Sequence, residues 1–139
     1  MKTLHFADGL EEYSLNSRVS VRFNPTDVGF LEKLSATFEK LDALQEEVRA
    51  SRESITDDRE VFPIASDLDA KMRAILNELF DSDICTPLFG EMNIFASSGG
   101  LPVWANLMLA ISEEVQGSMS AELAAREKRI AKYVDKYRK

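Results

Sequence analysis

The sequence predicts an α+β fold that is mainly α, with a short N-terminal β ribbon of two or three strands packed on three or four helices. Two observations support this prediction. Apolar and polar residues alternate in Val19–Phe23, as in a half-buried strand. Beyond Asn24 the apolar residues recur at intervals of three and four, as on one face of a helix. The change of period at Asn24 therefore separates a ribbon from a helical region.

The N-terminal segment has the pattern of a β ribbon. Thr3–Phe6 and Glu11–Leu15 are strand-like and flank Asp8-Gly9, a dipeptide typical of hairpin turns. Val19–Phe23 predicts a third strand after the polar link Asn16–Arg18. Because a short ribbon is only marginally stable in water, we expect it to pack on the helix that follows.

The join Asn24–Asp27 predicts the start of the first helix. Asn24 is a suitable N-cap, and Pro25 loses nothing at the first helical position because its missing N–H would be unpaired there. Asp27 suits the positive end of the helix dipole. The helix is expected to reach Ser51 or beyond, and residues 52–60 are either its solvated continuation or a loop. Its expected core residues are Phe30, Leu34, Phe38 and Leu41.

Further helices are predicted after Pro63, which interrupts the chain. Ser66 is a candidate cap for the second helix, and a short third helix ends at Gly90. Residues 95–102 have the composition of a flexible loop, and the last helix is expected to begin near Pro102. The apolar residues expected on these helices are Leu68, Met72, Ile75, Leu76, Leu79, Phe80, Trp104, Leu107, Met108 and Ile111.

Gly117 marks a kink or break in the last helix and divides the predicted domains. Residues 1–117 form one compact domain, with a ribbon over 1–23 and helices over 24–117, and residues 118–139 form a basic C-terminal helix or tail. Beyond Gly117 a thin stripe has the alternating steps of four and three that are typical of heptads. Two interpretations stay open, a surface that docks on another chain or a solvated, frayed end. The candidate partner-binding residues are Met119, Leu123, Arg126, Ile130, Tyr133 and Tyr137.

Charge is divided unevenly along the chain. The formal net charge is −7, but residues 126–139 carry +5 and the remaining residues carry −12. An acidic body with a basic end indicates that this end meets another molecule. Direct nucleic-acid binding is disfavoured, because the acidic body repels phosphate.

Residue chemistry argues against an enzyme. One cysteine, Cys85, and one histidine, His5, supply neither an internal disulfide, nor a metal-ligand set, nor a nucleophile–base pair. Acidic residues from Asp67 onward have part of the spacing of a calcium loop, but Met72 stands where glycine would make the turn. We therefore expect no catalytic residue, no cofactor and no metal, and Cys85 is expected in the core.

The sequence has neither a membrane-spanning segment nor a secretory signal that we can identify. No stretch approaches the roughly 20 apolar residues that span a bilayer, and the N-terminus lacks the long apolar run of a secretory signal. The sequence therefore predicts a soluble, cytoplasmic protein without a membrane partner.

Three segments, Val21–Asp27, Phe30–Leu34 and Asn77–Phe80, resemble the small tail assembly chaperones of long-tailed phages and prophages. The resemblance covers roughly residues 1–115. It implies a non-catalytic, mainly helical protein of the bacterial host cytoplasm that coats the tape measure protein, or another long helical phage protein, and is absent from the finished virion. Many members of that family are also made in a longer form by frameshifting. Short strand edges and few heptads further predict weak homo-oligomerisation.

Two other functions remain open. One is a permanent structural piece of a phage particle, such as a connector or a tail-completion protein held by its ribbon. The other is a helical regulatory protein that interacts through its heptad-like tail. A slippery heptamer with an overlapping frame at the 3′ end of the gene would favour the chaperone.

Overall fold

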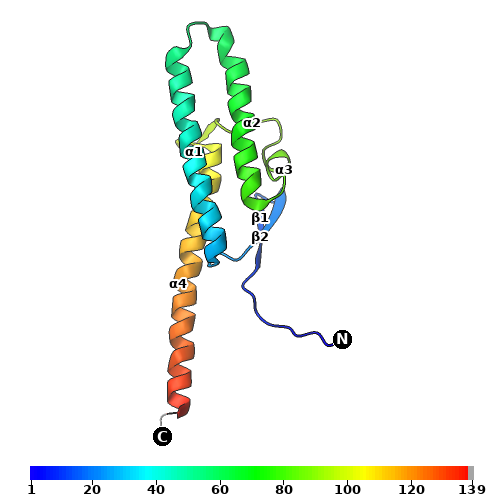
Figure 1. Cartoon of the computed structure of the whole chain (residues 1–139), viewed down its shortest axis with the longest axis vertical. Helices are drawn as coiled ribbons and strands as arrows, with labels where there is room; N and C mark the ends of the chain where they lie inside the picture. The colour runs from blue at the N-terminus through cyan, green and yellow to red at the C-terminus, as the bar shows by residue number, and fades with distance from the viewer. Residues whose placement is uncertain (138–139) are drawn as a thin grey trace.

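A computed structural model describes residues 1–137, without the side chains of Tyr133 and Tyr137. These two predicted contact side chains therefore lie outside the described part of the chain. The fold class is confirmed: residues 1–137 form two strands of an N-terminal ribbon, four α-helices and a second, very small hairpin (Figure 1). The elements are β1 (Glu11–Leu15), β2 (Val19–Phe23), α1 (Val28–Ser54), a 3-10 turn (Asp58–Glu60), α2 (Val61–Phe80), α3 (Cys85–Phe89), β3 (Ser97–Ser98), β4 (Leu101–Pro102) and α4 (Val103–Tyr137).

The ribbon has two strands, β1 and β2, and its turn differs from the predicted one. The chain reverses at Asn16 and Ser17, where φ is 51° and 57°. Positive φ at both central residues is the condition for a type I′ hairpin turn, which matches the twist of the strands. The predicted turn at Asp8-Gly9 and the predicted strand Thr3–Phe6 are therefore wrong, and Thr3–Phe6 lies outside the sheet.

Helix α1 begins one residue after Asp27, which is its N-cap. The Asp27 Oδ1 atom accepts a hydrogen bond from the Gly29 N–H at 3.0 Å. Asn24, the predicted cap, instead accepts from the Thr26 N–H at 2.9 Å and forms a turn before the helix. The helix therefore starts at the predicted junction, but its N-cap is Asp27 and not Asn24, because the Asp27 carboxylate reaches the first free N–H groups directly. Pro25 lies outside the helix as a result.

Helix α2 begins at Val61, earlier than predicted. Pro63 lies in its first turn, where a missing N–H breaks no helical hydrogen bond. Ser66 is therefore inside the helix and does not cap it. Residues 52–60 were expected to be either a continuation of the first helix or a loop, and both occur. Helix α1 continues to Ser54, and a short link then leads to the 3-10 turn.

Residues 95–102 form a hairpin of two-residue strands, β3 and β4, where a flexible loop was predicted. Gly99 and Gly100 make its turn with φ of 62° and 87°, values that glycine adopts without strain. The Val103 N–H donates to the Ala96 carbonyl at 2.8 Å. The hairpin therefore leads directly into α4.

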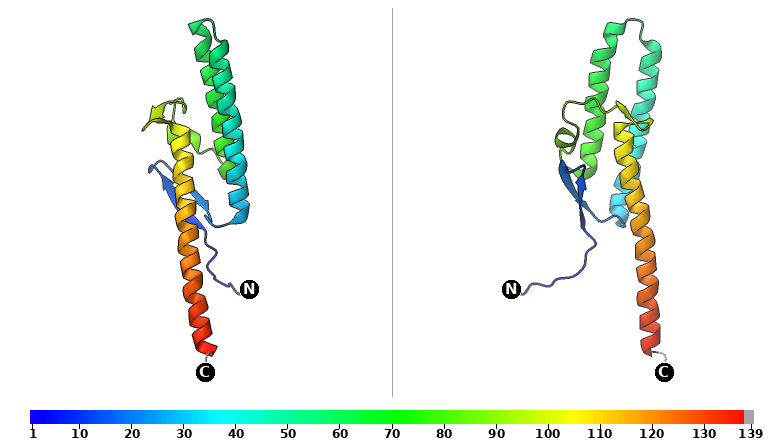
Figure 2. Two further views of the ribbon diagram at one scale, coloured as in Figure 1. Left: turned by 90° about the vertical axis from the view of Figure 1, so that its left-hand side faces the viewer. Right: turned by 180° about the vertical axis from the view of Figure 1, so that it is seen from behind.

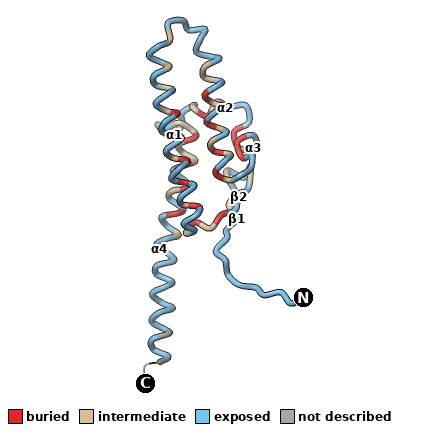
Figure 3. Tube along the Cα trace, in the orientation of Figure 1, coloured by how far each residue is buried: buried red, intermediate tan, exposed pale blue. Residues whose placement is uncertain are grey.

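Helices α1 and α2 form an antiparallel pair, and the first half of α4 packs beside them (Figure 2). Burial is concentrated where these three helices, α3 and the ribbon meet (Figure 3). Among the predicted core residues Phe38, Ile75, Phe80 and Leu107 are half-buried rather than buried. The buried core comprises Val21, Phe23, Phe30, Leu34, Leu41, Leu44, Leu68, Met72, Leu76, Leu79, Ile84, Cys85, Leu88, Phe89, Ile94, Trp104, Met108, Ile111 and Val115.

Stacked aromatic rings attach the ribbon to the helices. The Phe23 ring lies between Tyr13 and Phe30, with centroid separations of 4.5 Å and 4.3 Å. Phe80 closes the cluster from α2 at 5.9 Å from Phe23. This contact supplies the hydrophobic cover that a two-stranded ribbon needs. Among residues 1–137 no helix has the apolar run that would be needed to cross a bilayer.

Candidate functional site

The first half of α4 belongs to the core. Its apolar residues recur at steps of three and four, and Trp104, Met108, Ile111 and Val115 are all buried, with Met108 only 1% exposed. Among the side chains of the helix that the structure describes, Val115 is the last buried one and Ser118 is the last half-buried one. Beyond this point α4 leaves the body of the molecule (Figure 1).

The second half of α4 projects from the body, and its first turns share an open hollow with residues 7–11 and 24–26. We call residues 119–137 the α4 extension. The helix runs unbroken through Gly117, so this residue causes neither a kink large enough to end the helix nor a break. At 1.5 Å per residue the extension is about 28 Å long. Every one of its side chains that the structure describes is exposed (Figure 3).

An apolar stripe follows the α4 extension. Met119 is 43% exposed, and Leu123 and Ile130 are each 55% exposed. Arg126 lies on the same face by helical spacing. Val134, at 48% exposed, completes the stripe and was missed in the sequence, because a strict heptad places Tyr133 there. A period of 3.6 residues, which a straight helix has, would have found it.

The stripe is turned about the helix axis relative to the buried face of the same helix. At 100° per residue, the mean direction of Met119, Leu123, Ile130 and Val134 lies about 80° from the direction set by the buried residues of the first half. Helix α4 therefore has an apolar sector in each half, and the two sectors are offset. The core covers the part before Val115, and the part from Met119 onward is uncovered.

The α4 extension is also the basic part of the chain. Arg126, Lys128, Arg129 and Lys132 contribute to the charge of +5 over residues 126–139. Arg126 and Arg129 border a shallow hollow that also includes Ile130. A surface that combines apolar contacts with cations suits a partner that carries apolar and acidic groups along one face.

Tyr13 fixes the point at which α4 leaves the body. Its hydroxyl donates to Glu114 Oε1 at 2.9 Å, and the Ser118 hydroxyl donates to the same oxygen at 3.3 Å. Burial, together with the hydrogen bond to the Glu114 carboxylate and its charge, raises the pKa of Tyr13 to about 12. The ribbon is thereby tied to α4 immediately before the extension begins.

The acidic residues near the start of α2 have structural roles. Asp69 Oδ2 accepts from Arg73 Nε at 3.0 Å, and Asp69 Oδ1 accepts from the Ile94 N–H at 2.8 Å. Arg73 in turn donates to the carbonyls of Gly90 and Met92 at 2.8 Å and 2.6 Å. The pair therefore holds the segment after α3 onto α2. In the described part of the chain no three His, Cys, Asp or Glu side chains come close enough to hold a metal ion.

Cys85 and His5 show no arrangement suited to nucleophilic catalysis. Cys85 is 1% exposed, its thiol donates to the Arg73 carbonyl at 3.6 Å, and burial raises its pKa to about 12. Such a thiol is protonated at neutral pH and is a poor nucleophile. His5 lies on the exposed N-terminal segment, before β1.

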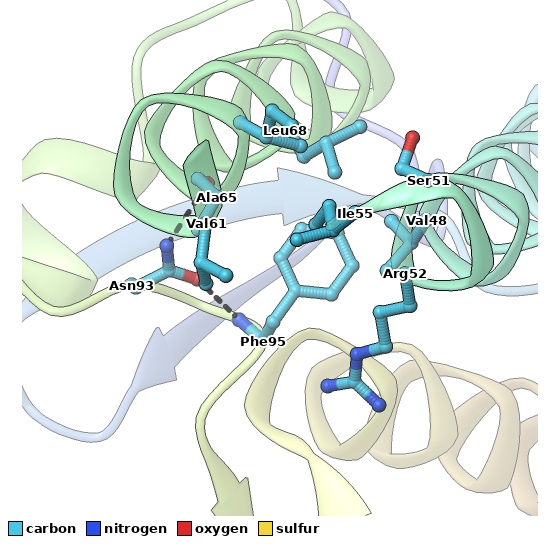
Figure 4. A pocket seen from close by; sticks show the side chains of 10 residues that line it. Val48, Ser51, Arg52, Ile55, Val61, Ala65, Leu68, Asn93 and Phe95 are labelled. Atoms are coloured by element: carbon cyan, nitrogen blue, oxygen red, sulfur yellow. Dashed lines mark hydrogen bonds between the residues drawn. The ribbon is translucent and has the colours of Figure 1, made fainter. Parts of the chain in front are cut away.

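A small hollow lies between α1 and α2 near their connection (Figure 4). The Phe95 ring points into this space, and Asn93 holds the segment by donating to the Ala65 carbonyl at 3.1 Å. The cavity has a volume of about 110 Å³, well below the roughly 300–1,000 Å³ of small-molecule sites. It is a packing hollow, whose lining is Val48, Ser51, Arg52, Ile55, Val61, Ile64, Ala65, Leu68, Asn93 and Phe95.

Comparison with family models, with curated proteins and with solved structures gave no match to this chain. A function therefore has to be argued from the chain itself. The α4 extension, with its exposed apolar stripe and basic side chains, is the surface best suited to binding a partner.

Proposed function

We propose that the chain is a non-catalytic tail assembly chaperone of a long-tailed phage, which binds the tape measure protein during tail morphogenesis. The α4 extension makes the contact. The observation that supports this proposal most directly is the uncovered apolar stripe on a basic helix that projects from an acidic body.

A tape measure protein is a long helical chain with apolar stripes that would aggregate if they were left bare. A second amphipathic helix laid along such a stripe covers it by side-chain packing. Fully burying a Leu or Ile side chain contributes about 1.5–3 kcal/mol, and the stripe residues are already about half buried. One copy therefore binds weakly. Contacts between neighbouring copies on one long partner would link these weak sites and make the coat bind more firmly.

The charge division suits this arrangement. The end that carries +5 faces the partner, and the remainder, at −12, faces outward. Two like-charged proteins repel one another when their surfaces come within about one Debye length, which is about 8 Å at physiological salt. Coated filaments would therefore be kept apart while the tail tube is built.

Co-expression with the long helical protein encoded downstream tests the proposal. The intact chain is compared with a chain that ends at Gly117, which retains every buried residue. We expect the intact chain to co-purify with the downstream protein and keep it in the supernatant, and the shortened chain to fail. If neither chain does so, the chaperone proposal fails. If both do so equally well, chaperoning stands but the contact through the α4 extension does not.

A structural protein of the assembled tail is the second candidate. The extended N-terminal segment described below favours it, because such segments commonly join neighbouring subunits. Mass spectrometry of purified particles separates the two, since a chaperone leaves the particle and a connector stays.

A further inference from the structure

The chain begins with an extended segment that we call the N-terminal arm, residues 1–8. Leu4 and Phe6 are 86% and 82% exposed, and their alternation with polar neighbours gives a strand pattern. The arm nevertheless lies outside both sheets and points away from the body (Figure 1). It is a strand-forming sequence whose large apolar side chains have no cover.

The root of the arm is held in a fixed direction. Gly9 has a φ of 74°, the Asp8 carbonyl accepts from Asn24 Nδ2 at 3.0 Å, and the Leu10 N–H donates to Asp8 Oδ1 at 3.0 Å. A β-carbon at Gly9 would overlap the Asn24 side-chain amide, so only glycine fits there. The bonded root directs the arm away from β1. The arm therefore does not fold back to form the hairpin that its sequence suggests.

A groove that fits a strand lies on the other side of the same ribbon. We call it the β1 groove. It has a volume of about 450 Å³, and its walls come from β1, the ribbon turn, α3, α4 and the segment between them, with no contribution from β2. β1 pairs only with β2 in its sheet, so its other edge is unpaired, and Ser14 and Leu15 at the turn end of β1 line the groove. Its apolar lining includes Leu15, Leu88, Phe89, Val103, Leu107 and Ala110.

The groove and the arm lie at opposite ends of the ribbon. The groove is next to the turn, and the arm leaves from the other end of β1 (Figure 1). Eight extended residues span roughly 26 Å, enough to reach a neighbouring molecule. We propose that the arm of one copy of this chain adds as a strand beside β1 of a second copy and places Leu4 and Phe6 in its β1 groove.

Strand addition satisfies both unpartnered features at once. The backbone of the arm supplies hydrogen bonds to the open edge of β1, and alternate side chains enter the groove. The charges of the arm and the groove are also compatible. Arg18, the charged residue of the groove, already donates to the Leu88 carbonyl at 2.9 Å, and Thr3, Leu4 and Phe6 bring no charge. Lys2 then approaches an acidic body. This inference does not rest on the proposed function, since a chaperone or a tail component can self-associate in this way.

Disulfide trapping between two differently tagged chains tests the pairing. One chain carries Leu4→Cys and the other Ala110→Cys, and both positions are exposed. Cys85 remains in both chains because it is buried. We expect a cross-linked heterodimer after mild oxidation of the mixture. The matched control replaces Ala110→Cys by Ala124→Cys, on an exposed part of α4 outside the groove, and should give little product.

Sedimentation across a concentration series measures the strength of the association. The variant Leu4→Ser/Phe6→Ser should raise the dimer dissociation constant by at least about tenfold, because burying one large apolar side chain contributes at least that factor. Its unfolding curve should match that of the parent at a dilution where the parent is monomeric, since both residues are exposed and association no longer adds stability there.

Two sedimentation results would overturn the proposal: a parent that stays monomeric at every concentration, or an arm variant that associates as strongly as the parent. Two disulfide results would also overturn it: an Ala124→Cys control that cross-links as well as Ala110→Cys, or a Leu4→Cys/Ala110→Cys chain that closes a disulfide within one dilute molecule. If the arm variant loses only its binding to the downstream protein, the arm serves that partner and the self-association proposal is wrong, while the chaperone proposal stands.

Discussion

The two halves of α4 carry similar apolar patterns and meet opposite environments. The half before Val115 places its stripe in the core, whereas the half from Met119 leaves its stripe in solvent. Local spacing alone does not cause this difference, since the apolar residues of each half keep to one face of the helix: the buried ones step by four, three and four, and the exposed ones by four, seven and four. The difference arises because α1, α2 and the ribbon pack on the first half of α4, whereas no described side chain of α4 after Ser118 is even half-buried.

The comparison separates the stability of the fold from the capacity to bind. The α4 extension contributes little to the core, and it is held helical by its Ala, Glu, Lys and Arg content and by continuity with the packed half. An apolar stripe that stabilises nothing within its own chain is available to another chain. The predictions that follow test this separation.

The largest expected difference is between two methionines of the same helix. Met108→Ala should lower the free energy of unfolding by about 2–5 kcal/mol, because it opens a cavity in the core. Met119→Ala should change it by less than about 0.5 kcal/mol, since its side chain is exposed. Urea denaturation of the two variants measures both values. Equal losses at the two positions would show that the extension packs on the body after all.

A second pair compares two arginines. Arg73, whose side chain is 17% exposed, binds Asp69 and two backbone carbonyls, whereas Arg49 pairs with Glu46 at the surface. Arg73→Ala should cost about 2–3 kcal/mol, because the part-buried Asp69 carboxylate and two backbone carbonyls lose a charged donor. Arg49→Ala should cost at most about 0.5 kcal/mol, as exposed ion pairs contribute little. A thermal unfolding series is sufficient, and a negligible effect at Arg73 would contradict its role in holding the segment after α3.

The smallest expected effect concerns the boundary between the halves. Tyr13→Phe removes the hydrogen bond to Glu114 and should cost about 1 kcal/mol near neutral pH. The folded state raises the Tyr13 pKa from 10.0 to about 12, so its proton is held more tightly than in the unfolded chain. The contribution of Tyr13 is therefore complete below pH 10 and is lost as the pH rises toward 12.

Denaturation at several alkaline pH values checks this dependence. The stability difference between the parent and Tyr13→Phe should shrink from pH 10 upward. Cys85, whose pKa is also raised, is present in both proteins and cancels from the difference. A constant difference across this range would contradict the proposed coupling of Tyr13 to Glu114.

The sequence predicted what depends on local pattern. The stripes of α1, α2 and α4 follow the helical period, so most of their core positions and the start of α4 near Pro102 could be identified in advance. The ribbon turn could not, because Asp8-Gly9 is a strong local turn signal and Asn16-Ser17 is a weaker one. Packing of Phe23 on Phe30 and Phe80 selects β1 and β2, and local turn preference is overridden.

The face on which the candidate contact residues lie could be predicted for a similar reason, whereas their role as contacts stays a prediction. Met119, Leu123, Arg126 and Ile130 lie together on an exposed face, as the spacing predicts. Whether that face is covered depends on where neighbouring elements end, which no local pattern reports. The β1 groove was missed altogether, since its walls come from segments far apart in the sequence.

One binding measurement tests the central claim that the stripe of the α4 extension is the contact surface. The variant Leu123→Asp/Ile130→Asp is compared with Ala124→Asp/Ala131→Asp, which adds the same charge to exposed positions on another face of the same helix. Binding to the proposed partner, the long helical protein encoded downstream, is measured by titration for both. We predict that the stripe variant loses at least about tenfold in affinity, because two apolar contacts are lost, and that the control stays within a few fold of the parent. Equal affinity in the two variants would contradict the claim.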